Sequence, residues 1–236
     1  MLKLFHAPTT RSLRIKWLLN ELCLPYETVT LDFYGYDRHD PAYRQINPMG
    51  SLPAMLDGAL AITESGAMIN HILRRHGDGR FTVPEGSDER VLVDEWMFWA
   101  EGLFAVHQRI YWDHCAPPPG CLIKTVPAVG LEGKRQAVRY ARMLENHLRE
   151  TGWVIGDELT GADFMLSFPL FLANLDNWFE GMPKIRAYIG RMTARPAFQE
   201  ATADTLEALQ AMATTTPKLP SFRSTEPDCE PANAMM

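Results

Sequence analysis

The sequence has few of the residues that form disulfide scaffolds or metal sites. It contains four cysteines in 236 residues and no CxxC pair. His114 adjoins Cys115, but no second Cys/His pair lies at metal-ligand spacing from it. We therefore expect no disulfide framework, no zinc ribbon, no dithiol redox motif and no metal.

The sequence also lacks long apolar runs and an excess of positive charge. No stretch approaches the ~18 consecutive apolar residues of a membrane span. The opening residues, MLKLFH, carry one lysine and no hydrophobic run of signal-peptide length, which favours a cytoplasmic location. Lysine and arginine number 23 against 29 aspartates and glutamates, a net charge of −6. Because an acidic surface repels backbone phosphates, a nucleic-acid partner is not expected. The lack of long apolar runs argues against a membrane.

The first 80 residues alternate between strand and helix patterns. Period-two alternation marks strands, and apolar residues at helical spacing mark helices. In chain order we expect a strand at 2–6, a helix at 12–24, a strand at 26–31, a loop with one short helical turn at 32–50, strands at 52–56 and 60–62 joined by a tight turn, and a helix from 63 to about 75. This β-α-β-α-β-β-α order predicts a thioredoxin-like α/β domain over residues 1–80.

After a glycine- and proline-rich stretch at 77–86, the pattern becomes helical throughout. Helices are expected at about 88–114, 132–151, 163–178 and 183–194, and strand-like alternation of useful length is absent after residue 82. Residues 87–213 therefore predict an all-α domain. The remainder, 214–236, is rich in proline and serine, and we expect a flexible tail.

Two short motifs in the first domain point to a bound peptide-like ligand. Pro53 begins a strand, and a cis Leu52-Pro53 bond would turn the backbone N–H and C=O of Leu52 outward as a template for an extended peptide. Glu64 and Ser65 stand at a helix N-terminus, where free N–H groups and the helix dipole favour a carboxylate. Each motif alone is typical of ordinary strand starts and helix caps, but the two together in one β-β-α unit favour a binding site.

The residues around these motifs closely resemble the glutathione transferases. The resemblance is carried by RIKWLLNELCLPYE at 14–27, NPMGSLPAMLD at 47–57 and ITESGAM at 62–68, and by the helix-capping sequence GDELTGAD at 156–163. It implies a glutathione site in which Leu52, before the cis Pro53, pairs with the cysteinyl part of glutathione. It also implies that Glu64 and Ser65 hold the γ-glutamyl amine and carboxylate.

The residue that stabilises the glutathione thiolate is less determined. Relatives use a tyrosine, serine, cysteine or other polar residue just after the first strand, but residues 6–14 contain neither Tyr nor Cys. Alignment on Arg14 places Thr10 at the position of a catalytic serine, and we favour it. Alignment of 7–9 with certain bacterial members places Thr9 at a ligand-contacting threonine. Ser12 is a third candidate hydroxyl, although it is better explained as the N-cap of the following helix.

Cations near the expected ligand are further candidates. Arg11 could lower the pKa of the thiol, although a solvated surface arginine is the commoner case. Many relatives have a lysine where this chain has Ser51, so contact with the glycyl carboxylate is expected to pass to Arg38 or His39 in the preceding loop. A histidine such as His39 is, taken alone, more often a plain surface loop residue.

The helix expected at 88–114 is rich in aromatic residues, most of which should form an ordinary core. Those nearest the cleft, among Phe104, His107 and Tyr111, are predicted to face a hydrophobic small-molecule electrophile. The resemblance also implies a homodimer, which is the commonest assembly of soluble proteins.

The resulting hypothesis is a glutathione transferase that uses glutathione as co-substrate and adds its thiol to hydrophobic electrophiles. Alternatives are a glutathione-dependent peroxidase, disulfide-bond reductase or thioether-cleaving enzyme. A non-enzymatic alternative is a glutathione-fold binding module, against which the intact Leu52-Pro53 and Glu64-Ser65 pairs argue.

Overall fold

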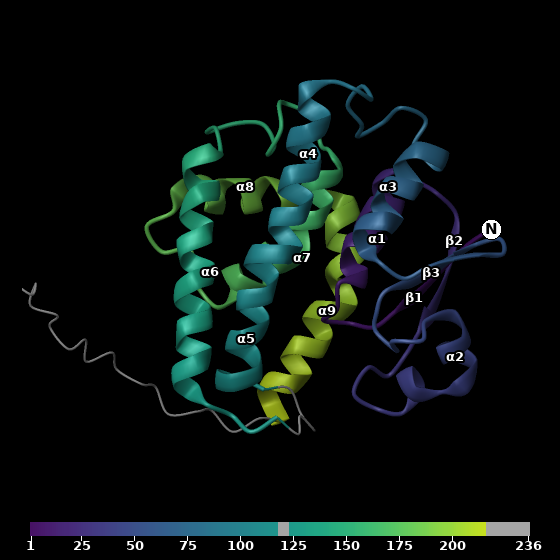
Figure 1. The fold of residues 1–236 in the computed structure, drawn as a ribbon, viewed down its shortest axis with the longest axis horizontal. Coiled ribbons are helices and arrows are strands. Elements are labelled where there is room, and N and C mark those ends of the chain that lie inside the picture. The colour runs from purple at the N-terminus through teal and green to yellow at the C-terminus, as the bar shows by residue number, and fades with distance from the viewer. Residues whose placement is uncertain (118–122, 216–236) are drawn as a thin grey trace, which may run out of the picture.

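A computed structural model describes residues 1–117 and 123–215. The tail predicted at 214–236 therefore lies outside the described residues, except for its first two positions, which end the last helix. A sheet with its helices stands beside a larger group of helices (Figure 1). No helix in the described ranges is both long enough and apolar enough to cross a membrane.

The sheet has four strands in the order β2-β1-β3-β4. β1 runs parallel to β2 and antiparallel to β3, and β3 is antiparallel to β4. The strands are β1 (Leu2–His6), β2 (Tyr26–Thr30), β3 (Ala54–Asp57) and β4 (Leu60–Ile62). This is the predicted thioredoxin-like arrangement, in which the central strand β1 ends at the loop that was expected to hold the thiolate.

Helices cover both faces of the sheet. α1 (Ser12–Glu21) and α3 (Ser65–His76) lie on the face turned toward the other helices, and α2 (Pro41–Ile46), preceded by a 3₁₀ turn at Asp37–His39, lies on the opposite face (Figure 1). Alternation along the strands explains both contacts. Leu4 and Met55 join the core with α1 and α3, whereas Phe5 and Ala54 pack with Tyr43 of α2.

The second part of the described chain is helical, as predicted, but its boundaries differ. The helix expected at 88–114 is divided by a π-helical segment, and the helix expected at 132–151 begins five residues earlier, at a proline suited to a first helical turn. The elements are α4 (Asp88–Trp99), the π segment (Ala100–Ala105), α5 (Val106–Cys115), α6 (Pro127–His147), α7 (Gly161–Leu175), α8 (Pro183–Thr193) and α9 (Pro196–Thr215).

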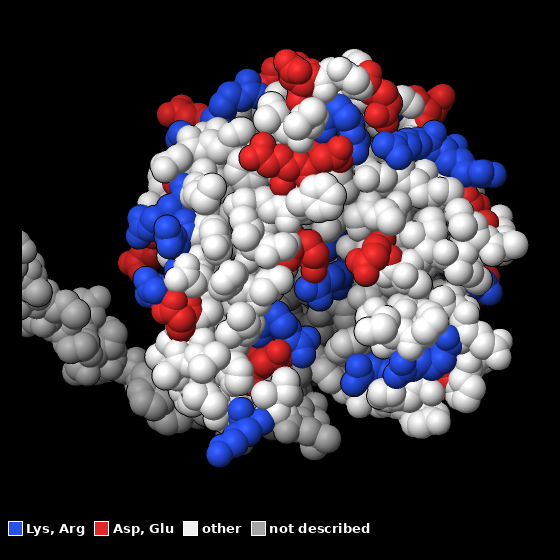
Figure 2. Space-filling model, in the orientation of Figure 1, with Lys and Arg blue, Asp and Glu red and all other residues white. Residues whose placement is uncertain are grey.

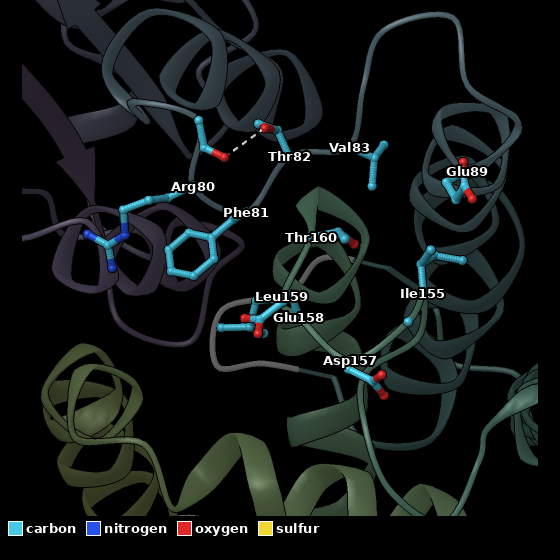
Figure 3. A pocket seen from close by; sticks show the side chains of 12 residues that line it. Arg80, Phe81, Thr82, Val83, Glu89, Ile155, Asp157, Glu158, Leu159 and Thr160 are labelled. Carbon is cyan, nitrogen blue, oxygen red and sulfur yellow. Dashed lines mark hydrogen bonds between the residues drawn. The ribbon is translucent and has the colours of Figure 1, made fainter.

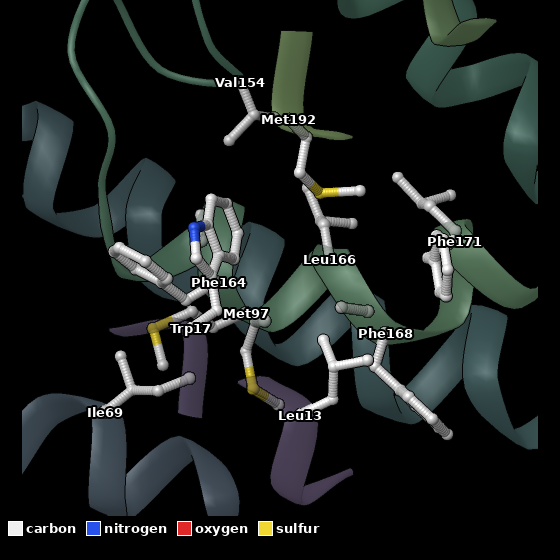
Figure 4. Packing of buried hydrophobic residues seen from close by; sticks show 14 of the residues in the cluster. Leu13, Trp17, Ile69, Met97, Val154, Phe164, Leu166, Phe168, Phe171 and Met192 are labelled. Atoms are coloured by element: carbon white, nitrogen blue, oxygen red, sulfur yellow. The ribbon is translucent and has the colours of Figure 1, made fainter. Parts of the chain in front are cut away.

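The two parts share one continuous hydrophobic core. Trp17 of α1 is fully buried and packs against Phe164 of α7 at a ring-centroid distance of 4.5 Å, and against Phe198 of α9 at 5.2 Å. Leu13 and Trp17 lie close to Met97 of α4 in the same cluster (Figure 4). The packing of α1 against α7, α9 and α4 therefore holds the preceding β1–α1 loop close to the helical part.

The predicted capping box at the start of α7 is present. The Thr160 backbone N–H donates to the Asp163 carboxylate at 2.8 Å, and the Thr160 side chain caps the helix in return. Asp163 also accepts from the Tyr188 hydroxyl at 2.7 Å, and burial raises the pKa of its carboxyl despite these bonds. The motif is structural and lies inside the helical core.

Candidate functional site

In the loop from β1 to α1, the neighbouring residues Thr9 and Thr10 differ in burial and in hydrogen bonding. Thr9 is half-buried and has φ of 61°, a left-handed conformation that β-branched residues rarely adopt. Its backbone N–H donates to the Thr205 hydroxyl of α9 at 3.3 Å, and its own hydroxyl has no hydrogen-bond partner in the described ranges. Strained residues of this kind are concentrated at functional sites.

Thr10 is buried, at 7% exposure. Its hydroxyl lies 2.8 Å from the Ala7 carbonyl oxygen and 2.6 Å from the Ser12 hydroxyl, so its single proton is committed inside the protein. The prediction that Ser12 caps α1 is wrong. Arg11 occupies the N-cap position, without a capping side chain, and Ser12 is the fully buried first residue of the helix.

A buried histidine connects this loop to the last helix. His6 Nδ1 lies 2.7 Å from Ser12 Oγ, and His6 Nε2 lies 2.8 Å from Asp204 Oδ2 on α9. Lys16 donates to the same Asp204 oxygen at 2.6 Å. Burial would raise the pKa of Asp204, but the bonds from His6 and Lys16 hold it well below its ordinary value. Because an ionised carboxylate only accepts, Nε2 of His6 carries the proton of their bond.

The Leu52-Pro53 peptide is cis, and Leu52 is buried. Neither the N–H nor the C=O of Leu52 bonds to another described residue. The preceding residue is fixed instead, because the Ser51 carbonyl accepts from the Tyr43 hydroxyl at 2.6 Å and from the Asn47 amide at 2.7 Å. Buried backbone groups are normally paired, so Leu52 offers a donor and an acceptor to an extended partner.

The predicted Glu64-Ser65 pair stands at the start of α3. Glu64 is the N-cap, its side chain makes no capping bond, and its carboxylate is exposed. Ser65 is buried and its Oγ accepts from Arg14 Nη1 at 3.0 Å. Arg14 is itself fully buried, and its Nε and Nη2 lack partners in the described ranges. A positive charge thus lies directly behind the serine that is expected to meet a carboxylate.

Glu101, in the π-helical segment, forms ion pairs with two arginines: Arg14 in α1 and Arg11 at the N-cap of α1. One carboxylate oxygen accepts from Arg14 Nη1 at 2.7 Å and the other accepts from Arg11 Nε at 2.5 Å. Burial alone would raise the pKa of Glu101, but Arg14 and Arg11 hold it below its ordinary value. Arg11 is therefore ion-paired across the two parts of the molecule, unlike the solvated arginine that sequence reasoning considered commoner.

The two cations proposed for the glycyl carboxylate lie in the 3₁₀ turn before α2. Arg38 stacks on the Phe33 ring at 5.1 Å, and its buried Nε lacks a partner in the described ranges. His39 Nδ1 accepts from Arg44 Nη2 at 3.2 Å, which brings a second arginine to this corner. In Figure 2 the surface is hollowed between the part that carries α2 and the helical part, with charged side chains along its rim.

The aromatic residues predicted to face an electrophile turn into the helical bundle. Phe104 is fully buried between Trp99 and Phe179, with ring centroids 5.7 and 6.2 Å away, so its predicted pocket position is wrong. No pattern in the sequence indicated this rotation, because a π-helical segment changes the direction in which the side chains around it point. His107 and Tyr111, in α5, also pack against aromatic residues of the helical part. His107 packs on Tyr140 of α6 at 5.3 Å, and Tyr111 packs edge-on against Trp178 at 5.0 Å.

A surface pocket lies elsewhere, between the linker after α3 and the loop before α7. It has a volume of about 590 Å³ and is lined by residues 79–83, Glu89 and residues 155–160. Phe81, Leu159 and Thr160 lie along it in Figure 3. Thr160 is already engaged in the capping box. The pocket contains none of the predicted site residues, and we assign it no chemistry.

Sequence reasoning missed three residues that organise the site. Asp204 and Thr205 lie in α9, which was not predicted as a separate helix, and Glu101 lies where an unbroken helix was expected. Glu101 left a detectable signal, because it is the one charged residue between Trp96 and Val106. Asp204 left none, since polar residues are common on a surface helix.

Comparison with known families decides what this arrangement is. Residues 1–74 match the glutathione S-transferase N-terminal domain, and residues 115–196 match the glutathione S-transferase C-terminal domain. The chain belongs to the glutathione S-transferase family. In this transferase the two matches together cover the β1–α1 loop, the Leu52-Pro53 peptide, the start of α3 and the capping box.

Known proteins with similar sequence and fold agree with this assignment. Glutathione S-transferase 3 of Schizosaccharomyces pombe is 28% identical over 210 residues, which cover 84% of this chain and 85% of that protein. A crystal structure of a glutathione S-transferase from Actinobacillus pleuropneumoniae has a TM-score of 0.70 at 27% identity, covering 87% of this chain and 93% of the other. A disulfide-bond oxidoreductase of Escherichia coli is 24% identical over 172 residues, covering 69% of this chain and 76% of that protein.

Proposed function

We propose that this transferase binds reduced glutathione in an extended form between the β1–α1 loop, Leu52 and the start of α3, and adds its sulfur to a hydrophobic electrophile. The observation that carries the proposal is the backbone of Leu52, whose N–H and C=O have no partner among the described residues. A buried N–H and C=O without partners are costly, and the cysteinyl backbone of glutathione has the complementary acceptor and donor.

The charged groups support one orientation of glutathione. The γ-glutamyl ammonium would meet the exposed Glu64 carboxylate, and the γ-glutamyl carboxylate would meet Ser65 and the free N–H groups of the first turn of α3. Arg14 lies behind Ser65 and reinforces the attraction for that carboxylate. The glycyl carboxylate, at the other end of the tripeptide, would lie toward Arg38 and His39.

Within this frame the thiolate is assigned to Thr9 rather than Thr10. A free thiol with a pKa of ~8.5 is mostly protonated at neutral pH, so a donor to sulfur is required. Thr9 is half-buried and its hydroxyl has no partner among residues 1–117 and 123–215, whereas the Thr10 proton is held by Ala7 or Ser12. Within the same ranges the Thr10 and Arg11 backbone N–H groups make no backbone bond and could add to the same site.

In the transfer reaction the thiolate sulfur forms a bond to the electrophilic carbon and the electron pair moves to the leaving group or the substrate. A second candidate, supported by the relative that is a disulfide-bond oxidoreductase, is disulfide reduction. There the thiolate attacks one sulfur of the disulfide and displaces the other as a thiolate. A second glutathione thiolate then attacks the glutathione sulfur of the mixed disulfide, which releases the remaining half of the substrate as a thiolate and leaves oxidised glutathione.

We further propose a homodimer and a cytoplasmic location. Support for the dimer comes from α4, where Val91 and Phe98 lie seven residues apart on one helical face. They are 67% and 78% exposed. A large aromatic residue so exposed beside a second apolar residue is typical of an interface.

Binding and chemistry can be tested separately. Retention on immobilised glutathione, with elution by free glutathione, tests the binding site. Turnover is then measured with a panel of aryl halides, conjugated carbonyls, hydroperoxides and a mixed disulfide. Thioether product from the first two classes supports transfer, and oxidised glutathione from the last two supports reduction. Binding without turnover of any class would contradict the enzymatic proposal and favour a binding module.

A further inference from the structure

Three potential metal-binding side chains converge at the end of α3 away from Ser65. Asp57 closes β3, and His71 and His76 lie in the second half of α3. Nε2 of each histidine is 2.8 Å from the same oxygen, Oδ2 of Asp57. The three side chains are 13–25% exposed, so the cluster opens to solvent on one side.

The atoms that converge are those that transition metals prefer. Two imidazole nitrogens and one carboxylate oxygen all lie within 4.8 Å of one another. Two ligands at the usual ~2.0–2.1 Å from a zinc-like ion stand about 2.9–3.4 Å apart. The present nitrogen–oxygen gaps of 2.8 Å therefore need to open by only a few tenths of an ångström to admit an ion in place of the bridging protons.

We propose that Asp57, His71 and His76 form a binding site for a divalent transition-metal ion of the Zn²⁺, Co²⁺ and Ni²⁺ group. Two histidines and one carboxylate are a ligand set that these ions favour over Mg²⁺ or Ca²⁺. Water completes the coordination on the exposed side. The site is independent of glutathione binding, because it lies at the opposite end of α3 from Ser65.

The local electrostatics both favour and oppose a cation. His76 is the last residue of α3, and the C-terminal end of a helix dipole attracts positive charge. The Asp57 carboxylate oxygen that meets both imidazole rings brings negative charge to the point where they converge. Arg75 opposes the ion, since its Nε lies 3.4 Å from Asp57 Oδ2, but its side chain is 68% exposed and free to turn into solvent.

Sequence reasoning did not find this cluster because its members are distant along the chain. Asp57 precedes His71 by 14 residues and His76 by 19, and they meet only because β3 and α3 pack side by side. A bound ion would cross-link the β3–β4 hairpin to α3. Its expected effect is therefore on the stability of the first domain rather than on turnover.

The experiment uses the full chain without an affinity tag, stripped with a chelator and titrated with Co²⁺ and Zn²⁺. We expect one ion per chain by calorimetry, visible absorption bands when Co²⁺ binds, and a rise in melting temperature that the chelator reverses. The absence of saturable binding by either ion would overturn the proposal.

Variants locate the ion. His71→Gln, His76→Gln and Asp57→Asn keep a polar group and should each weaken binding at least tenfold, whereas the control His114→Gln should not change it. Arg75→Ala should strengthen binding, because it removes a competing charge, whereas a purely hydrogen-bonded cluster would gain nothing. Circular dichroism and glutathione retention confirm that each variant is folded. Unchanged stoichiometry and affinity in the two histidine variants would also overturn the assignment.

Discussion

At the scale of single residues, Thr9 and Thr10 differ in what their hydroxyls can still do. We predict that Thr9→Val raises the pKa of the bound glutathione thiol by about one unit or more, because the donor to sulfur is lost while shape is kept. Thr10→Val should leave that pKa unchanged and instead lower the free energy of unfolding by about 1–2 kcal/mol, because a buried hydrogen bond is lost.

Thiolate absorbance against pH measures the first effect and denaturant unfolding measures the second. Valine is β-branched like threonine, so the unusual backbone of Thr9 is equally strained in the variant and the comparison is matched. A pKa shift in Thr10→Val alone would return the role to Thr10, in agreement with the alignment on Arg14. No shift in either variant would assign the sulfur to backbone N–H groups or to Arg11.

Glu64 is expected to contribute mainly to glutathione affinity. Glu64→Gln leaves the γ-glutamyl ammonium without its opposite charge, and the loss of such a contact typically costs ~1.5–3 kcal/mol, or about tenfold or more in affinity. Calorimetric titration with glutathione measures it. Glu89→Gln is the matched control, because Glu89 also stands in the first turn of a helix, α4. Equal affinities for the two variants would displace the γ-glutamyl site from α3.

Site residues could be predicted where a short local motif has a known structural role. They could not be predicted where tertiary packing sets the direction of a side chain. A proline at the start of a strand predicted the role of Leu52 and Pro53, and a helix N-terminus predicted the role of Glu64 and Ser65. The same reasoning misassigned Ser12, because His6 and Thr10 draw its hydroxyl inward. Hydroxyl orientation depends on neighbours such as Asp204, almost 200 residues away, which a local pattern does not contain.

At the scale of elements, α9 holds the β1–α1 loop from outside the first domain. We predict that Asp204→Asn weakens this contact, because His6 and Lys16 both lose an ionised acceptor. The free energy of unfolding at pH 7 should fall by about 1–2 kcal/mol. The Michaelis constant for glutathione should rise as well, because Thr205 next to Asp204 holds the Thr9 backbone.

The same variant should change the acid response. Because the pKa of Asp204 is lower in the folded chain than its ordinary ~3.9, its stabilisation is complete above that value and is lost as pH falls toward the folded value. Urea unfolding of wild type between pH 6 and 3 should therefore show a decline that is smaller in Asp204→Asn. Glu207→Gln, an exposed change on the same helix, is the control. Parallel curves for wild type and Asp204→Asn would refute this role.

The elements that sequence reasoning placed well have strong periodicity, and those it missed have weak periodicity. The sheet strands and α1 carry alternating or helically spaced large apolar residues. α9 turns Ala201, Thr202 and Thr205 inward, which are fully or almost fully buried yet small or polar, so its inner face is not apparent in the sequence. The π-helical segment, which contains Phe104, was not predicted either, because the sequence pattern was compatible with one unbroken helix.

At the scale of the whole molecule, the exposed face of α4 should decide the assembly. Wild type is expected to have a mass in solution of about twice the chain mass of 26.7 kDa. Phe98→Glu places a charge in the proposed interface and should halve that mass, because a buried unpaired carboxylate is strongly disfavoured. Light scattering after size exclusion measures it. Leu131→Glu, an equally conspicuous apolar residue on α6, is the control, and a monomeric wild type would contradict the proposed dimer.

The contacts from Asp204 and Thr205 to the β1–α1 loop also have a consequence for biosynthesis. The ribosome makes the chain from its N-terminus, and the sheet with α1 and α3 emerges early and can begin to fold as a unit. His6 and Thr9 nevertheless gain their partners on α9 only after about 200 further residues have been added. A nascent chain thus contains the proposed glutathione-binding residues Leu52, Glu64 and Ser65 long before α9 can fix the β1–α1 loop, which is proposed to contact the sulfur. Stalled chains that end before residue 204 should therefore bind glutathione weakly and leave its thiol protonated.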